Sequence, residues 1–168
     1  MMRRLLQNAA GKLCEGLLPI KHEYYVGAGK TVAICTLSSI DLLQTIAKSD
    51  LINRALIVGR LLSENKGIDA IISFSLKHPY LKRIVLCGNE VKGHKAGQAL
   101  LALASNGIDP SGRIFGAAGP NPIVTLPLSN VELFRDQVEI IDIIGTHMSN
   151  IPLLLEEISK YCNLDYRG

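Results

Sequence analysis

The segment at residues 88–98, GNEVKGHKAGQ, has the residue types best suited to ligand chemistry in this chain. The imidazole of His94 is a suitable nitrogen donor for a transition metal. Gly93 and Gly97 flank it and would let a flat, bulky ligand approach the backbone. Glu90 is close enough in sequence to accept a hydrogen bond from the other ring nitrogen and so orient the ring. A solvated histidine near a helix start is the competing interpretation. On spacing alone it is favoured, because one histidine is weak evidence of ligation.

The other histidines, His22 among them, have structural interpretations. His78 precedes Pro79 at an expected helix end, where a polar or cationic side chain complements the helix dipole. His147 lies in a polar break, and no two histidines have the i, i+4 spacing of a metalloprotease site. The four cysteines show no CxxC or CxxH spacing. A metal bound by His94 is therefore expected to arrive inside a cofactor that supplies its other ligands.

A phosphate-binding loop is excluded, although residues 27–31 end in the letters GKT. The leading glycine of that motif would fall on Tyr24, and the motif requires a strand before it and a helix after it. Here the apolar run that follows Lys30 predicts a strand, so the order is reversed.

Composition limits the possible partners. The 168 residues are 48% hydrophobic and 20% charged, which is typical of a globular domain. A net charge of +3, 5% aromatic residues and no tryptophan argue against a nucleic-acid partner. Gln7, Asn8 and Lys12 interrupt the apolar N-terminal segment, which argues against an export signal. No run has the length of a membrane-spanning helix, so we expect a soluble, cytoplasmic protein with no transmembrane segment of its own.

The elements that must position His94 alternate between strand and helix. Short apolar runs predict buried parallel strands at residues 31–36, 54–58 and 83–87, and a weaker strand at 113–115. Helical spacing predicts helices at residues 39–48, 64–77, 98–104, 129–141 and 150–161, with an extra N-terminal helix at 3–15. Ser39 and Ser129 are the expected caps of two of these helices. The alternation predicts one α/β domain over residues 1–168.

Ligands of open α/β sheets bind outside the carboxyl ends of the strands. The loops at these ends are rich in glycine, hydroxyl and amide residues. The candidate binding residues from these loops are Thr36, Leu37, Ser38, Ser39, Glu64, Asn65, Gly88, Glu90, Val91, Gly93, His94, Gly97, Gly116, Gly119 and Pro120.

Ordered motifs over nearly the whole chain, from about Gly16 to Ile158, resemble one known family. They include EYYVG at 23–27, VAICTLSS at 32–39, SENKGI at 63–68, LCG at 86–88 and EVKGH at 90–94. With these motifs the chain resembles the A subunit of the methyl-tetrahydromethanopterin:coenzyme M methyltransferase of methanogens, the corrinoid-carrying component of a membrane complex.

The resemblance implies a Rossmann-like domain, a mostly parallel sheet with helices on both faces, that holds a cobamide. The cofactor would be 5-hydroxybenzimidazolylcobamide or cobalamin, with His94 as the lower axial ligand of cobalt, and this reverses the preference for a solvated histidine. The implied reaction moves a methyl group from tetrahydromethanopterin to cobalt(I), then from methyl-cobalt(III) to the thiol of coenzyme M. In the family's complex the second transfer is coupled to sodium transport, and other methyltransferase subunits are the implied partners.

Three departures from the family keep other functions open. The chain has no C-terminal membrane helix, Ser63 stands where the family usually has threonine, and residues 3–15 lie outside the resemblance. We therefore expect a homologue that lacks the anchor, or a chain cut before it. The alternatives are a soluble corrinoid carrier or storage protein, or a methyl carrier for another methyltransferase system without sodium pumping. A nucleotide-binding regulatory domain of the same architecture is a further alternative.

Overall fold

The computed structural model describes residues 24–163, whose strands form one five-stranded sheet in the order β1-β3-β2-β4-β5. The strands are β1 (Tyr24–Val26), β2 (Val32–Cys35), β3 (Ile57–Gly59), β4 (Arg83–Leu86) and β5 (Glu139–Asp142). Strands β3, β2, β4 and β5 run parallel, and β1 pairs antiparallel with β3 at one edge. The predicted α/β class with a mostly parallel sheet is therefore confirmed.

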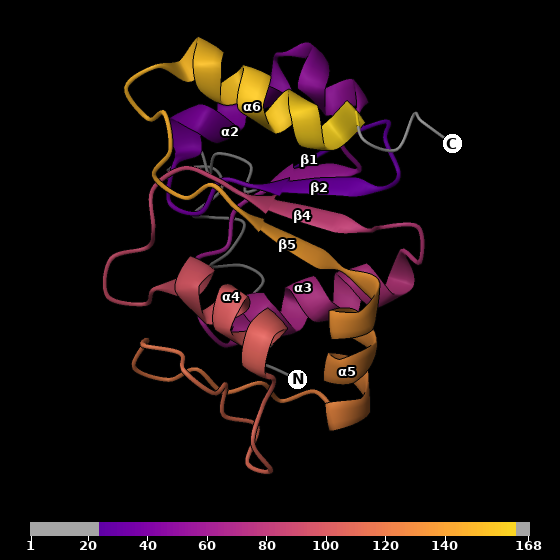
Figure 1. Cartoon of the computed structure of the whole chain (residues 1–168), viewed down its shortest axis with the longest axis vertical. Coiled ribbons are helices and arrows are strands. Elements are labelled where there is room, and N and C mark those ends of the chain that lie inside the picture. Colours follow the sequence, from indigo (N-terminus) through magenta and orange to yellow (C-terminus); the bar gives the residue numbers. More distant parts are fainter. Residues whose placement is uncertain (1–23, 164–168) are drawn as a thin grey trace, which may run out of the picture.

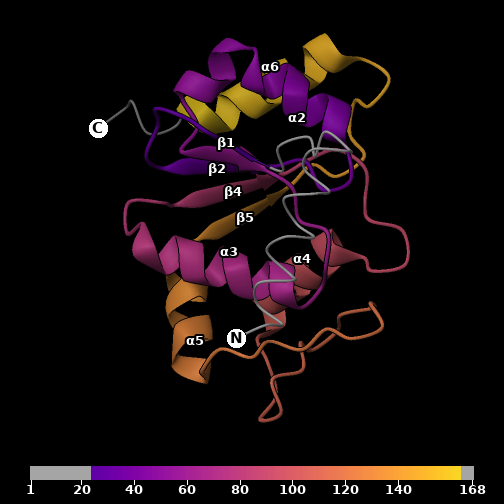
Figure 2. The same ribbon diagram turned by 180° about the vertical axis from the view of Figure 1, so that it is seen from behind.

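Helices cover both faces of the sheet (Figure 1). On one face lie α2 (Ile40–Ala47), the short 3₁₀ helix η1 (Asp50–Asn53) and α6 (Ile151–Asn163). On the other lie α3 (Lys66–Lys77), α4 (Ala96–Asn106) and α5 (Leu128–Gln137), as the view from behind in Figure 2 also shows. None of the helices between residues 24 and 163 combines the length and the apolar character needed to cross a bilayer.

Alternating strand residues divide the apolar core between these two faces. Ile34 and Val85 pack with α2 and α6, whereas Ala33 and Ile84 pack with α3 and α4. Every residue of β2 is buried, as expected for a central parallel strand covered on both sides. The far end of α6 is held at the amino end of β3, because Arg54 donates hydrogen bonds to Ser159 Oγ at 2.9 Å and Asn163 Oδ1 at 3.0 Å.

The order in which the strands are added to the sheet changes direction at β2. This strand has β3 on one side and β4 on the other, so the loops that follow β2 and β4 leave the sheet at adjacent carboxyl ends in opposite directions. Such a switch point is where open α/β sheets bind ligands.

Two predicted strand positions differ from the structure. Residues 113–115 are no sheet strand: they lie in a loop, residues 107–127, that has only the isolated bridges Ile108–Ile114 and Arg113–Ile123. The sheet's last strand is β5, where the sequence predicted the end of a helix over residues 129–141. The apolar residues at 138, 140 and 141 fit both the helical spacing of three to four residues and the two-residue alternation of a strand. A short run of this kind does not distinguish strand from helix.

Neither predicted serine makes a capping hydrogen bond. Ser39 does stand directly before α2, but its hydroxyl makes no bond to the helix amides and instead accepts from the Asn89 amide at 2.8 Å. Ser129 lies inside α5, which begins at Leu128 after Pro127, so its predicted position is wrong. The predicted N-terminal helix at residues 3–15 and His22 fall outside the described residues.

Candidate functional site

A buried carboxylate supports the candidate ligand His94. His94 lies in the turn between β4 and α4, and its Nδ1 is 2.8 Å from Glu64 Oε2. The Glu64 side chain is 1% exposed, whereas that of His94 is 55% exposed. With Nδ1–H donating to the carboxylate, Nε2 carries the lone pair. Among residues 24–163, Nε2 makes no hydrogen bond, so it is available as a donor atom for a ligand.

Glu64 is held in its charged form. Burial raises the pKa of this carboxyl, but hydrogen bonds from its own backbone amide, from the Asn121 amide and from His94 outweigh that effect and bring the pKa below its ordinary value. The Asn121 amide donates to Oε1 at 2.9 Å, so each carboxylate oxygen has a partner. Glu64 therefore presents a fixed negative charge to the histidine ring at neutral pH.

The sequence suggested that Glu90 orients the His94 ring, but in the structure the residue that contacts the ring is Glu64. The Glu90 carboxylate instead accepts hydrogen bonds from backbone amides on both sides of His94 in the chain. Its Oε1 accepts from the amides of Val91 at 2.7 Å and Gly97 at 3.0 Å, and its Oε2 accepts from the amide of Gln98 at 2.7 Å. The bonds from Gly97 and Gln98 satisfy amides of the first turn of α4, which otherwise lack partners, and place a negative charge at the positive end of the helix dipole.

The two glycines beside His94 have different roles. Gly93 has a φ of +83°, and a Cβ built there meets nothing within 4 Å, so the space beside His94 is open. Gly97 is buried, and a Cβ there would come within 2.9 Å of Leu37, Ile144 and the Glu90 carboxylate. Gly97 is therefore required for close packing within the protein, and only Gly93 offers a ligand access to the backbone.

The candidate residues in the loop after β2 bind the loop after β4, which carries His94. Ser38 Oγ donates to the carbonyl of Asn89 at 2.7 Å, and Ser39 Oγ accepts from the amide of the same residue. Gly88 has a φ of +78°, and a Cβ there would crowd Thr36 and Ser39. The side chains of Thr36 and Leu37 are fully buried, so they shape the switch point from within.

Loop 107–127 returns to the His94 turn. The side-chain amide of Gln98 binds this loop through both of its polar atoms. Nε2 donates to the Gly116 carbonyl and Oε1 accepts from the Ala118 amide, each at 2.8 Å. A Cβ at Gly119 would collide with the carbonyl oxygen of His94 and lie 2.9 Å from Glu64 Cγ. Gly119 is therefore packed directly against the Glu64–His94 pair.

The remaining candidates lie near this pair in loops that surround it. Asn65 donates to the Asn121 carbonyl at 3.3 Å and accepts from the Lys66 amide at the start of α3. Pro120 is exposed next to Gly119, and Val91 packs partly against the core.

Three supporting residues were not among the predicted candidates. Arg60 donates from Nε to the carbonyl of Leu37 at 3.1 Å and from Nη2 to that of Ser38 at 3.2 Å, which fixes the loop after β2. Gln98 and Asn121 fix loop 107–127 against the site. Gln98 is the last residue of the segment at 88–98 that carries His94, which was a usable signal. Arg60 and Asn121 act through backbone groups and leave no pattern in the sequence.

His78 takes its predicted place at the C-terminal end of α3, where its Nδ1 is 2.7 Å from the Phe74 carbonyl. Within residues 24–163, no three side chains of histidine, cysteine, aspartate or glutamate come together as a metal site.

The mostly parallel sheet, its helices on both faces and its switch point define an α/β domain of the Rossmann-like class. Comparison with known families gives a more specific result. Residues 12–163 match the family described as the A subunit of tetrahydromethanopterin S-methyltransferase. The chain belongs to this family.

Several relatives carry the same description. The chain is 38% identical over 125 residues to the second A subunit of the tetrahydromethanopterin S-methyltransferase of Methanothermobacter marburgensis, covering 73% of this chain and 65% of the relative. It is 44% identical over 92 residues to the correspondingly named protein of Methanothermobacter thermautotrophicus, covering 54% of this chain and 50% of the relative. The chain thus spans only about half to two thirds of the length of these relatives.

A protein of Methanosarcina barkeri aligns over more of the chain. Its name assigns it provisionally as the A subunit of a methyltransferase called Mtx. It is 31% identical over 152 residues, covering 89% of this chain and 72% of the relative. The relatives thus include components of differently named methyltransferases.

Proposed function

We propose that this chain is a cobamide-binding methyl carrier of a methyltransferase, with Nε2 of His94 as the lower axial ligand of cobalt. The observation that carries the proposal is the half-exposed imidazole at the sheet's switch point, hydrogen-bonded at 2.8 Å to a buried carboxylate. Membership of a methyltransferase family supports the same function.

The residues present fit such a cofactor. A corrin ring brings four equatorial nitrogens, so the protein needs to add only one axial donor and room beside it. His94 is a nitrogen donor of the right type, and the open space at Gly93 lies next to it. When bound, the cobamide would supply the cobalt that accepts and releases the methyl group.

The protein's own side chains would act through His94. Glu64 keeps the proton on Nδ1 and so leaves the Nε2 lone pair for ligation, and its charge makes the imidazole a stronger donor. Glu90 holds the turn that carries His94 by binding the first amides of α4. Both residues would be positioning residues, because they act through the turn and the ring.

The names of the relatives support tetrahydromethanopterin as the source of the methyl group. The resemblance in sequence motifs adds the thiol of coenzyme M as the acceptor and further methyltransferase subunits as partners. For this chain the donor, the acceptor and the partners are part of the proposal.

Binding of cobinamide tests the axial ligation directly. Cobinamide lacks a base of its own, so a nitrogen ligand must come from the protein. Reduced to cobalt(II) and bound, it is expected to show nitrogen superhyperfine splitting in its electron paramagnetic resonance spectrum, which changes from a triplet to a doublet when the protein is labelled with ¹⁵N-histidine. The splitting should vanish in His94→Ala and persist in the control His78→Gln. An unchanged spectrum in His94→Ala would refute ligation.

A second measurement separates a methyl carrier from a storage protein. The full chain loaded with methylcobalamin is mixed with coenzyme M, with and without candidate partner subunits, and the methylated thiol is quantified. Transfer that depends on this chain supports the carrier function. Stable binding with no transfer under either condition favours storage.

A further inference from the structure

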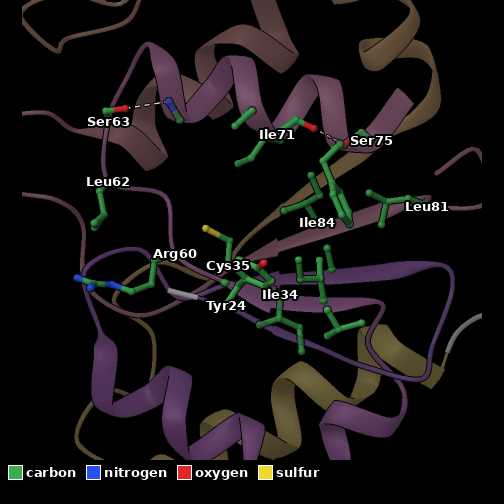
Figure 3. A pocket seen from close by; sticks show the side chains of 17 residues that line it. Tyr24, Ile34, Cys35, Arg60, Leu62, Ser63, Ile71, Ser75, Leu81 and Ile84 are labelled. Atoms are coloured by element: carbon green, nitrogen blue, oxygen red, sulfur yellow. Dashed lines mark hydrogen bonds between the residues drawn. The ribbon is translucent and has the colours of Figure 1, made fainter. Parts of the chain in front are cut away.

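A cavity of about 650 Å³ lies between α3 and the sheet, beside the Glu64–His94 pair but separate from it. In Figure 3, Ile71 and Ser75 of α3 lie across this space from Cys35 and Ile84 of the sheet. Its volume is within the range of sites that bind small molecules, roughly 300–1,000 Å³. It is called the α3 cavity below.

The lining of the α3 cavity suits an uncharged planar group. Arg60 is the only charged side chain among the described residues that line it, and most of the others are apolar. Tyr24 and Phe74 contribute aromatic rings, against which a flat ring system can stack. A charged group in the middle of this lining would lose its hydration without gaining a partner. The cavity therefore favours an aromatic base over a charged ligand.

One end of the α3 cavity lies at the edge of the sheet that carries His94. Ser63, in the loop after β3, lines the cavity. The next residue in the chain is Glu64, whose carboxylate is 2.8 Å from Nδ1 of His94. Figure 3 shows Leu62 and Ser63 at this end of the cavity and Leu81 at the opposite end. The cavity thus begins one residue from the side chain that holds the imidazole.

Ligation by His94 leaves the cofactor's own base without its place on the metal. A complete cobamide carries an aromatic base on a flexible tail, and that base can occupy the lower axial position of cobalt. In the proposed function Nε2 of His94 occupies this position, so the base is displaced. A largely apolar ring gains free energy when it leaves water for an apolar site. An apolar cavity beside His94 offers such a site within reach of the tail.

Arg60 matches the charge of the tail, which contains a phosphodiester. It lines the α3 cavity next to β3, and its Nε and Nη2 donate to the carbonyls of Leu37 and Ser38. Within residues 24–163, its Nη1 makes no hydrogen bond. A guanidinium that two hydrogen bonds hold in place, with a third nitrogen still able to donate, is well suited to a phosphate oxygen.

We infer that the α3 cavity holds the displaced base of the cobamide, and that Arg60 binds the phosphate of its tail. The inference rests on the proposed function, because it requires His94 to take the axial position. The base packs between α3 and the sheet, against Ile57, Ile71 and Phe74. The cavity, and not His94, then distinguishes cobamides that differ in their base.

A blocked cavity tests the inference by comparing two cofactors. Ala70 lines the cavity but is exposed, so Ala70→Trp narrows the space without entering the core. Ser73→Trp on the same helix is the control, because Ser73 is not among the lining residues. Calorimetric titration of the full chain should show cobalamin affinity falling about tenfold or more in Ala70→Trp. The affinity for cobinamide, which has no base, should change by less than about twofold.

The control variant should bind both cofactors as the wild type does. Retained binding of cobinamide also shows that Ala70→Trp is folded with its His94 site intact. Equal changes for cobalamin and cobinamide in Ala70→Trp, including no change for either, would overturn the placement of the base.

A second measurement needs no variant. With methylcobalamin bound to the wild-type chain, nuclear Overhauser contacts are expected from the methyl groups of the dimethylbenzimidazole to the methyls of Ile57 and Ile71 and to the ring of Phe74. A base without these contacts would overturn the inference. If cobinamide still shows splitting that depends on His94, the proposed function stands and only the cavity assignment fails. A cobinamide spectrum that is unchanged in His94→Ala refutes the proposed function itself.

Discussion

Glu64 and His94 are thirty residues apart in the sequence, and their side chains meet at 2.8 Å. Glu64 lies just before α3, and His94 lies in the turn before α4, so the contact joins two loops at the carboxyl edge of the sheet. The two partners differ sharply in exposure, at 1% and 55%. A pair of this kind fixes the solvent-facing ring through the buried partner, so the orientation of the ring depends on the charge of Glu64.

Replacing the carboxylate should affect both folding and ligation. Glu64→Gln keeps the size of the side chain but removes its charge and one acceptor oxygen, so the free energy of unfolding should fall by about 1–3 kcal/mol. The nitrogen superhyperfine splitting of bound cobinamide should weaken without vanishing, since His94 remains. Chemical denaturation at neutral pH measures the first effect and electron paramagnetic resonance the second. A variant as stable as the wild type with an identical spectrum would show that Glu64 has no positioning role.

Acid should remove the contribution of Glu64. Its pKa in the folded protein lies below the ordinary value, so its stabilising effect is present above the pKa of the unfolded chain, about 4.3, and is lost as the pH falls through the lower folded value. The difference in unfolding free energy between wild type and Glu64→Gln should therefore be constant near neutral pH and shrink below about pH 4. Urea titrations at several pH values measure it. A difference that grows in acid would reverse the assigned direction.

Removing the cap of α4 should loosen the His94 turn. Glu90→Ala leaves the amides of Val91, Gly97 and Gln98 without their acceptor, at a cost of about 1–2 kcal/mol. These amides should exchange faster with deuterium, and the affinity for cobinamide should fall. The control is Glu132→Ala, which breaks an exposed pair with Arg135 and should cost less than about 1 kcal/mol. Unchanged exchange at Gly97 and Gln98 would argue against the cap.

Two glycine substitutions separate close packing from backbone conformation. Gly119→Ala places a methyl group against the His94 carbonyl and the Glu64 side chain, so it should displace the pair and strongly reduce cobinamide binding. Gly145→Ala is the control, because φ there is +73° and a Cβ meets no atom within 4 Å, so the change costs only the left-handed conformation, about 1 kcal/mol. Calorimetric titration of both variants measures the difference. Equal losses of affinity would mean that contact with Gly119 is unimportant.

Arg60 should matter for the loop after β2. Arg60→Lys removes the simultaneous bonds to the carbonyls of Leu37 and Ser38, because a single ammonium group does not reproduce the planar fork of arginine. We expect a loss of about 1–2 kcal/mol in the free energy of unfolding and faster amide exchange at Ser38 and Asn89. Thermal denaturation and exchange measurements test this. Full retention of protection in the variant would exclude the role.

The sequence predicted the central strands well because buried parallel strands are continuous apolar runs, as in β2. It missed β5, since the residues at 138–141 fit a helix and a strand equally. It also proposed Glu90 as the partner of His94 because the two are close in the chain. The true partner, Glu64, is brought there only by the packing of loops from different strands. Contacts of that kind depend on tertiary structure, and no local spacing reveals them.

The hydrogen bonds from Arg54 to Ser159 and Asn163 hold the last turn of α6 at the amino end of β3. The His94 turn follows β4, so it lies at the carboxyl ends of the strands, on the opposite side of the same sheet from the amino end of β3. A fluorophore, affinity tag or surface linker attached to the side chain at position 163 would therefore lie on the side remote from His94. Immobilisation through this position should present His94 to the solution, which makes it the preferred orientation for surface-based binding assays.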